Sequence, residues 1–316
     1  MRSRDVSFFL TTKRANSRPM TLLRSVGFSL ACSVLGVTAA ALVPVPAALA
    51  QDARAAEQSE AAYRRAVAHR RAGQLDEAAA AAEEAIRLRP THAAAHFTLG
   101  AVRRQQNRLE DALVAFRRVV ELEPQHQESR AMTGAVLARL NRFDEAVIEL
   151  QRAVELNPRD AASWGNLGAS LRRLRRVDEA IAAYERALVA LPDNPDLLNN
   201  YAVALRQAGR PEEAIAALEG ALARTPDSAD VHLNLAIAYR SVQRFAEAAR
   251  EYEAWYRVTP APTDAGPLFD LGFCYEQTNR REDAVRIYRI YQGLVSGRDA
   301  QGTDRVAERL DGLNAQ

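Results

Sequence analysis

Three asparagines recur at one fixed spacing and could form hydrogen bonds with a peptide backbone. Asn166, Asn200 and Asn234 lie 34 residues apart, and an acidic residue, Asp270, follows 36 residues after the last of them. An asparagine amide offers both a donor and an acceptor, and an extended backbone needs both. A row of such amides would hold a peptide without selecting for its side chains.

Two histidines are the strongest candidates for metal ligands. His92 and His96 have the i,i+4 spacing that places two side chains on one face of a helix. A zinc site needs at least a third protein ligand, and none is visible for this pair. The chain also shows no glycine-rich phosphate loop, nucleophile elbow or cysteine cluster. The sequence therefore predicts no metal, no cofactor and no catalytic activity.

Arginines accompany the asparagine row. Arg173 and Arg206 flank it and are candidates to bind carboxylates of a partner. Further arginines recur in the same register, at Arg70, Arg104, Arg172 and Arg240. The last turn of a helix also favours cations because of the helix dipole, so this pattern has a structural explanation as well as a functional one.

The elements that carry these residues form a repeat. Six prolines are spaced 34 residues apart: Pro90, Pro124, Pro158, Pro192, Pro226 and Pro260. An alanine precedes each by 12 residues, and a seventh, Ala284, follows after a two-residue insertion. With the proline numbered 32, Gly or Ala stands at position 8 and Ala at 20, and most repeats carry large residues at 4, 7, 11 and 24; the first helix of the first repeat departs from this, with Ala62 at position 4. Small residues let two helices approach closely, and proline ends the second helix.

This pattern resembles the tetratricopeptide repeat. The fourth repeat matches best, with Trp164, Leu167, Gly168, Ala180, Tyr184, Ala187 and Pro192. The resemblance implies an all-α, right-handed superhelical solenoid of about seven helix-turn-helix repeats. It also implies that the first helices line a concave groove, in which positions 2, 5, 6, 9, 12 and 13 are open to a ligand. Asparagine is common at position 6 of this family, so the row has a background explanation too.

Two aromatic side chains are expected at the C-terminal end of this groove. Phe269 and Phe273 occupy positions 5 and 9 of the seventh repeat, and in the resembled family these positions face the groove. Two large apolar groups one turn apart would form a pocket for a partner's side chain. The alternative is that the final helix folds back over them.

The N-terminal segment lies outside the repeat. Residues 1–24 are basic, the stretch from Val26 to Val43 is apolar, and Ala48-Leu49-Ala50 follows. This order predicts a secretory signal peptide cleaved after Ala50, with Met20 as an alternative start. An uncleaved membrane anchor is the alternative, because about 18 apolar residues can span a bilayer. Both interpretations place the repeats outside the cytoplasm.

Charge and cysteine content limit the partners. Cleavage would remove six basic residues and one acidic residue, which leaves 36 basic and 39 acidic residues and a net charge of −3. This balance gives no reason to expect nucleic acid. Every remaining cation is an arginine, which favours forked, bidentate contacts with carboxylates. Cys274 alone remains, so no internal disulfide is expected, and a buried small hydrophobe is its expected role.

The sequence thus predicts four segments: a signal peptide (1–50), a short lead-in (51–58), seven repeats (59–296) and a C-terminal capping helix (297–316), for which Thr303 is the expected N-cap. The predicted function is a non-enzymatic scaffold in the periplasm or cell envelope that binds a protein or peptide, with no small-molecule substrate. Contact with a membrane is expected only if the N-terminal segment stays uncleaved. The alternative is a structural subunit of an envelope complex that uses its convex face or forms homo-oligomers.

Overall fold

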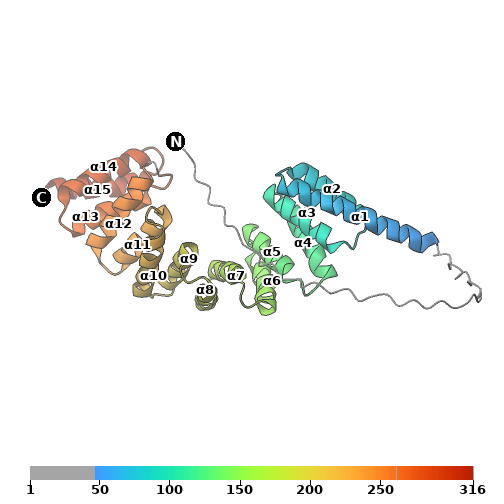
Figure 1. Ribbon diagram of the computed structural model, residues 1–316. Coiled ribbons are helices and arrows are strands. Elements are labelled where there is room, and N and C mark those ends of the chain that lie inside the picture. Colours follow the sequence, from blue (N-terminus) through green and yellow to red (C-terminus); the bar gives the residue numbers. More distant parts are fainter. Residues whose placement is uncertain (1–46, 261, 316) are drawn as a thin grey trace, which may run out of the picture. The chain divides into compact units, whose positions relative to one another are not determined.

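The computed structural model describes residues 47–260 and 262–315, which form helices and short turns and contain no strand (Figure 1). The predicted all-α class is therefore confirmed. The predicted signal peptide lies mostly outside the described residues, as does its whole apolar stretch. The first described helix begins at Ala47, so it contains the predicted cleavage site and the residues expected as a lead-in. No helix in the described part is long and apolar enough to cross a bilayer.

The helices alternate between a first and a second helix in each repeat. The first helices are α1 (Ala47–Arg71), α3 (Ala93–Gln105), α5 (Gln127–Arg139), α7 (Ala161–Arg173), α9 (Pro195–Gln207), α11 (Ala229–Ser241) and α13 (Gly266–Gln277). The second helices are α2 (Leu75–Leu88), α4 (Leu109–Leu122), α6 (Phe143–Leu156), α8 (Val177–Ala190), α10 (Pro211–Arg224), α12 (Phe245–Val258) and α14 (Arg281–Val295), and α15 (Ala300–Ala315) ends the chain.

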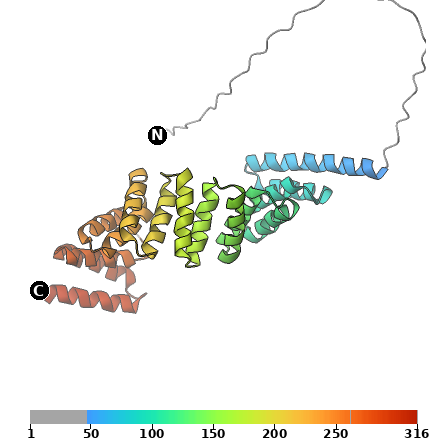
Figure 2. The ribbon, with the colours of Figure 1, turned by 90° about the horizontal axis from the view of Figure 1, so that it is seen from below.

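Each helix packs against its neighbours in the chain, and several first helices also contact the next first helix, as α5 contacts α7. The unit formed by Ala47–Gln316 is thus a solenoid of helix pairs stacked in chain order, which both ribbon views show (Figures 1 and 2). This arrangement places equivalent positions of successive first helices next to one another. It is the geometry that a row of side chains along the stack requires.

Small residues hold the two helices of each repeat together. The position-20 alanines are all fully buried: Ala78, Ala112, Ala146, Ala180, Ala214, Ala248 and Ala284. The position-8 glycines lie against the large residue at position 24. A Cβ added to Gly168 would stand 2.9 Å from the Tyr184 ring, and one added to Gly100 would stand 2.8 Å from the Phe116 ring. The predicted close approach of the helices is therefore confirmed.

The turn inside each repeat has a feature that the sequence analysis missed. Position 15 has a positive φ in all seven repeats, at Gly73, Asn107, Asn141, Arg175, Gly209, Gln243 and Asn279. Glycine and asparagine adopt this left-handed conformation most easily. The recurrence of glycine and asparagine at position 15 in the sequence indicates this turn. Arg175 and Gln243 adopt it at a cost.

The second helices begin with a paired arginine and acid. Arg142 donates two hydrogen bonds to Glu145, of 2.6 and 2.7 Å, and Arg176 donates two of 2.7 Å to Glu179. These bonds lower the pKa of both carboxyl groups. The expected forked contacts are present, and the acids lie in the first helical turn, where the dipole favours them.

The two ends of the stack differ in their packing. One continuous core extends from Ala101 to Leu313, whereas the first repeat contributes three small, alanine-rich clusters. At the other end, α15 buries Val306, Leu310 and Leu313. The predicted N-cap of this helix is wrong: α15 begins at Ala300, and Thr303 donates back to the Asp299 carbonyl. Asp299 fills the capping role, since its carboxylate accepts from the Gly302 N–H at 2.9 Å.

Candidate functional site

The predicted asparagine row lies along the face formed by the first helices, which we call the first-helix face. Its three members differ in their surroundings. Asn166 is exposed and lines a pocket of about 370 Å³ between α5 and α7. Asn200 is half-buried. Asn234 is also half-buried, and its amide donates to the Asn199 Oδ1 at 3.0 Å. One amide of the row is therefore already paired within the protein.

Asp270 stands at the same position in the seventh repeat, but its carboxylate binds side chains of the protein. Its Oδ2 accepts from the Tyr252 hydroxyl at 3.2 Å and lies 3.3 Å from an Arg240 guanidinium nitrogen. Burial raises the pKa of the Asp270 carboxyl, while the Arg240 charge opposes that rise. Asp270 is thus part of the junction between the sixth and seventh repeats.

The two predicted carboxylate partners have no ion pair among the described residues. Arg173 is exposed, lies 5.4 Å from the centre of the Phe143 ring and lines the same pocket as Asn166. Arg206 is half-buried on α9. Many other arginines in the described part pair with acids, whereas these two do not.

The two phenylalanines are partly covered by the last helix. The Arg305 guanidinium lies 5.4 Å from the centre of the Phe269 ring, and that of Arg309 lies 5.7 Å from the centre of the Phe273 ring. Phe273 also meets Phe245 edge to face, at 5.7 Å between ring centres. The sequence left open a free pocket or a folded-back helix, and the structure shows α15 against both rings. Phe269 still lines a hollow of about 340 Å³.

The candidate metal pair does not converge. His92 is the N-cap of α3 and is buried, with its Nδ1 2.8 Å from the Ser59 hydroxyl oxygen. His96 points elsewhere, with its Nε2 2.9 Å from the Pro90 carbonyl oxygen. No group of three metal-ligating side chains occurs in residues 47–260 and 262–315. Cys274 is buried, and burial raises the pKa of its thiol to about 12, which makes it a poor nucleophile.

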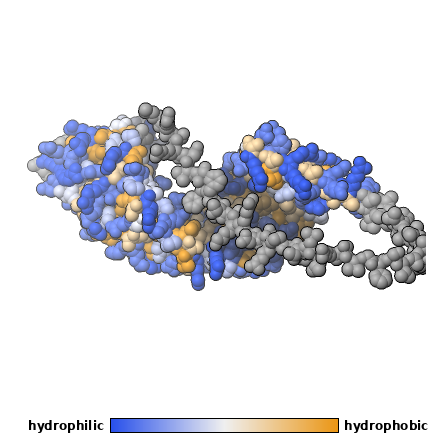
Figure 3. Space-filling model, in the orientation of Figure 1, coloured by the Kyte–Doolittle hydropathy of each residue, from blue (hydrophilic) through white to orange (hydrophobic). Residues whose placement is uncertain are grey.

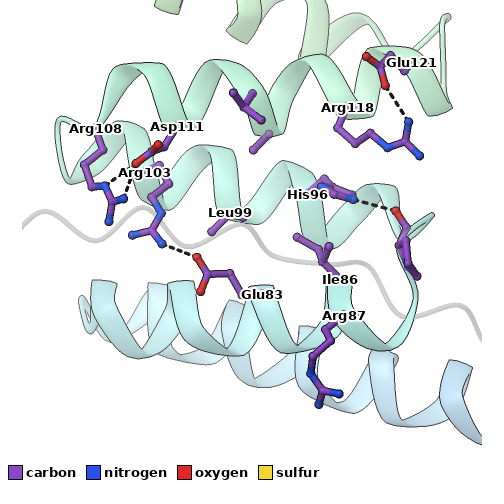
Figure 4. Close-up of a pocket in the computed structure, with 13 residues that line it drawn as sticks. Glu83, Ile86, Arg87, His96, Leu99, Arg103, Arg108, Asp111, Arg118 and Glu121 are labelled. Carbon is purple, nitrogen blue, oxygen red and sulfur yellow. Dashed lines mark hydrogen bonds and ion pairs between the residues drawn. The ribbon is translucent and has the colours of Figure 1, made fainter.

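One cavity was not predicted. It measures about 750 Å³ and opens between α2, α3 and α4, and Leu99 and Ile86 line it (Figure 4). Its lining includes paired charges, such as Arg118 with Glu121 at 2.7 Å. The small side chains of α2 do leave the first repeat with little core volume, since Ala82 stands where the next repeat carries Phe116. Less side-chain volume fills this end of the stack.

The outer surface carries a few exposed apolar groups, of which Val114 also lines the cavity between α2, α3 and α4. Val114, Ile148 and Val189 on the second helices are 71%, 60% and 82% exposed. In one view, the surface is largely hydrophilic with scattered apolar patches (Figure 3). Single exposed apolar residues are ordinary on soluble proteins, so this face is a weaker candidate site than the first-helix face.

Comparisons with known proteins agree with the repeat geometry. Residues 145–265 match the family described as "Cytochrome c-type biogenesis protein H TPR domain". Residues 45–93 and 63–126 match one tetratricopeptide repeat family, and residues 103–171 match another. No curated protein matches the chain.

Solved structures are similar in fold at low sequence identity. PilF of Pseudomonas aeruginosa is 19% identical, with 69% of this chain and 97% of that chain covered and a TM-score of 0.59. PilW, described as a widely conserved type IV pilus biogenesis factor, is 20% identical, with 67% and 96% covered and a TM-score of 0.58. YrrB, described as a TPR protein with an unusual peptide-binding site, is 18% identical, with 61% and 98% covered and a TM-score of 0.53. Repeat spacing, helix pairing and family matches show that the chain belongs to the tetratricopeptide repeat proteins.

Proposed function

We propose that the protein is a non-enzymatic scaffold that binds an extended peptide or partner tail on its first-helix face. The observation that carries this proposal is the pocket between α5 and α7, which the exposed Asn166 and Arg173 both line, two helical turns apart on α7. The exposed Asn166 amide can form hydrogen bonds with a peptide backbone. The Arg173 guanidinium, which has no acidic partner among the described residues, can pair with a carboxylate of the peptide. The peptide-binding site named for YrrB supports a binding role for this fold.

The proposed location is the periplasm or cell envelope. Support comes from the basic, apolar and A-x-A order at the N-terminus, and from similarity to a pilus biogenesis factor and a cytochrome c-type biogenesis domain. N-terminal sequencing of the protein isolated from cells tests this location. The sequence of the exported form should begin at Gln51. An intact N-terminus in the membrane fraction would favour the anchor.

Binding is tested by titrating a partner obtained by pull-down from envelope extract. The triple variant Asn166→Ala, Asn200→Ala, Asn234→Ala should weaken binding, because each lost hydrogen bond contributes about 0.5–1.5 kcal/mol net. The internal bond from Asn234 to Asn199 means that Asn166 and Asn200 should account for most of the loss. Arg186→Ala, at an exposed site on α8, is the control. Equal binding by the triple variant and by wild type would contradict the proposal.

A second candidate function is a structural subunit that associates through its second helices. The exposed Val114, Ile148 and Val189 favour it, since apolar side chains on an outer surface can mark an interface. A self-associating subunit would elute as an oligomer at micromolar concentration, and Val189→Asp would shift it to a monomer. If the protein is instead the scaffold proposed above, wild type and Val189→Asp should both elute as monomers.

A further inference from the structure

A buried histidine lies where the first repeat meets the second. His92 is the N-cap of α3 and only 4% exposed. On one side it faces α1, which presents Ser59, Glu60 and the Tyr63 ring, whose centre is 5.1 Å from that of the imidazole. Arg89, at the end of α2, is also close enough for its charge to act on the ring. A change in the charge of His92 therefore acts on the contacts between the first repeat and α3.

The hydrogen bonds around His92 assign its protons. Ser59 is fully buried, and its hydroxyl donates to the Ala85 carbonyl of α2 at 2.7 Å. A hydroxyl has one proton to donate, so the Ser59 oxygen accepts from His92 Nδ1, which is 2.8 Å away. In the neutral ring, Nε2 then carries no hydrogen. These two bonds link α1, α2 and α3 while the imidazole is uncharged.

A proton added to Nε2 meets an unfavourable environment. Burial disfavours the charged ring, and the nearby charge of Arg89 adds to this effect, so the pKa of His92 lies below its usual value. The Glu60 carboxylate opposes the shift, but its oxygen is 3.7 Å from Nε2 and also pairs with Glu60's neighbour Arg64 through the second contact of that carboxylate at 3.1 Å. His96, on the same helix, again disfavours the proton. The closed first repeat thus prefers a neutral His92.

Little apolar packing supports this contact. The first repeat has three separate buried clusters, and nearly all of their members are alanines: Ala62, Ala85 and Ala95; Ala66, Ala81 and Ala82; Ala78, Ala79 and Val102. An alanine removes less apolar area from water than a larger side chain does. The polar contacts at His92 are therefore a large part of what holds α1 and α2 on α3.

The other buried histidine is bonded differently. The ring nitrogens of His232 lie 2.7 Å from a Glu251 carboxylate oxygen and 2.8 Å from the Pro226 carbonyl oxygen. In the third repeat an arginine has the same two kinds of partner, since Arg130 donates to Glu149 at 2.8 Å and to the corresponding proline carbonyl at 2.9 Å. Both nitrogens of His232 can donate, so a proton bound there breaks no hydrogen bond. Acid should therefore act on the first repeat and spare the sixth.

We propose that His92 is a pH-sensitive switch: the neutral ring holds the first repeat closed on α3, and protonation releases α1 and α2 while the later repeats stay folded. Opening would uncover Ala95 and Val102 of α3, which are fully buried against α1 and α2, and so expose an apolar end of the stack. The switch goes beyond the proposed function, because the pocket between α5 and α7 lies in the third and fourth repeats.

Hydrogen exchange of the purified protein, followed by mass spectrometry between about pH 7.5 and about pH 5.5, tests this switch. The open repeat binds the proton more readily than the closed one, so its opening constant should rise by up to about tenfold per pH unit below about 6.5. Protection factors, from which the intrinsic pH dependence of exchange is divided out, should fall accordingly for the α2 amides. Those of α10 should stay constant, because the fifth repeat contains no histidine.

Variants assign the effect to His92. His92→Gln should remove the pH dependence of α2 protection, because glutamine stays neutral. His96→Gln, one turn further along α3, should keep it, since the Nε2 of His96 lies against the Pro90 carbonyl instead. Glu60→Gln removes the carboxylate that favours the charged ring, so it should deepen the acid loss. This third variant keeps the test decisive if His92→Gln opens the first repeat at every pH.

Four results would overturn the switch: α2 protection that does not change with pH, an equal loss in α2 and α10, an unchanged pH dependence in His92→Gln, or a shallower loss in Glu60→Gln. An equal loss in both helices would show that acid unfolds the whole stack. Acid-dependent loss in α2 alone, kept by His96→Gln and deepened by Glu60→Gln, is the expected result.

Discussion

Gly272→Ala should destabilise the seventh repeat even though alanine favours helices. Gly272 lies within α13, and a Cβ added there would stand 2.7 Å from both Cδ1 and Cζ of the Tyr288 ring. That ring is fully buried, and its hydroxyl donates a hydrogen bond to the Glu276 carboxylate. The ring therefore has little freedom to move aside.

The expected magnitude follows from two opposing effects. Overpacking a core costs about 1–3 kcal/mol, and the fixed ring places this site near the upper value. Replacing glycine by alanine inside a helix returns about 1 kcal/mol. The net loss in the free energy of unfolding should be about 2 kcal/mol. Gly293→Ala in α14 is the control, because it has no neighbouring atom within 4 Å and should stabilise by up to about 1 kcal/mol.

Urea unfolding of both variants, followed by circular dichroism, measures the difference. Repeat proteins can unfold one part at a time, so hydrogen exchange of the α13 and α14 amides should locate the change. If Gly272→Ala and Gly293→Ala both raise the urea midpoint, the contact between the residues at positions 8 and 24 does not restrict the side-chain size at Gly272.

Three further outcomes are expected. Ala180→Leu should cost about 1–3 kcal/mol by overpacking a fully buried site, whereas Ala182→Leu, at an exposed site of the same helix, should be near neutral; equal thermal midpoints would refute the register. Burial lowers the pKa of His92 below its usual 6.5, so the unfolded chain binds the proton more readily than the folded one, and stability should fall as the pH drops below about 6.5. In a pH series of urea midpoints, His92→Gln should flatten the decline below about pH 6.5. An unchanged slope would show that His92 does not cause this decline. Arg175→Gly should stabilise by about 0.5–1 kcal/mol, because the positive φ of 64° costs arginine more than glycine; a lower thermal midpoint would argue against strain at this turn.

The backbone of this fold could be predicted from the sequence because each repeat is specified locally. Proline at position 32 and small residues at positions 8 and 20 act within one helix pair, and the family resemblance that they carry implied the pairing and the all-α class. The left-handed turn at position 15 was also predictable, since Gly73 and Asn107 belong to a series of residues that favour it.

The side-chain partners on the first-helix face could not be predicted in this way. Asn234 bonds to Asn199 of the preceding repeat, and Arg305 of α15 covers Phe269. Such contacts depend on how neighbouring repeats rotate against each other and on where the last helix docks. Residues at equal positions therefore have different roles: the Asp270 carboxylate binds side chains of the protein, whereas Asn166 stays exposed.

Site-specific photo-crosslinking in cells tests most directly whether the first-helix face binds the partner. A benzophenone side chain at Ala169, which lines the pocket between α5 and α7, is compared with one at Ala182, an exposed site on the second helix α8. We expect the variant at Ala169 to form a covalent adduct with one partner polypeptide, with the crosslink mapped by mass spectrometry to an extended segment of that partner, and the variant at Ala182 to form none. Adducts from Ala182 and none from Ala169 would contradict the account and place the interface on the second helices.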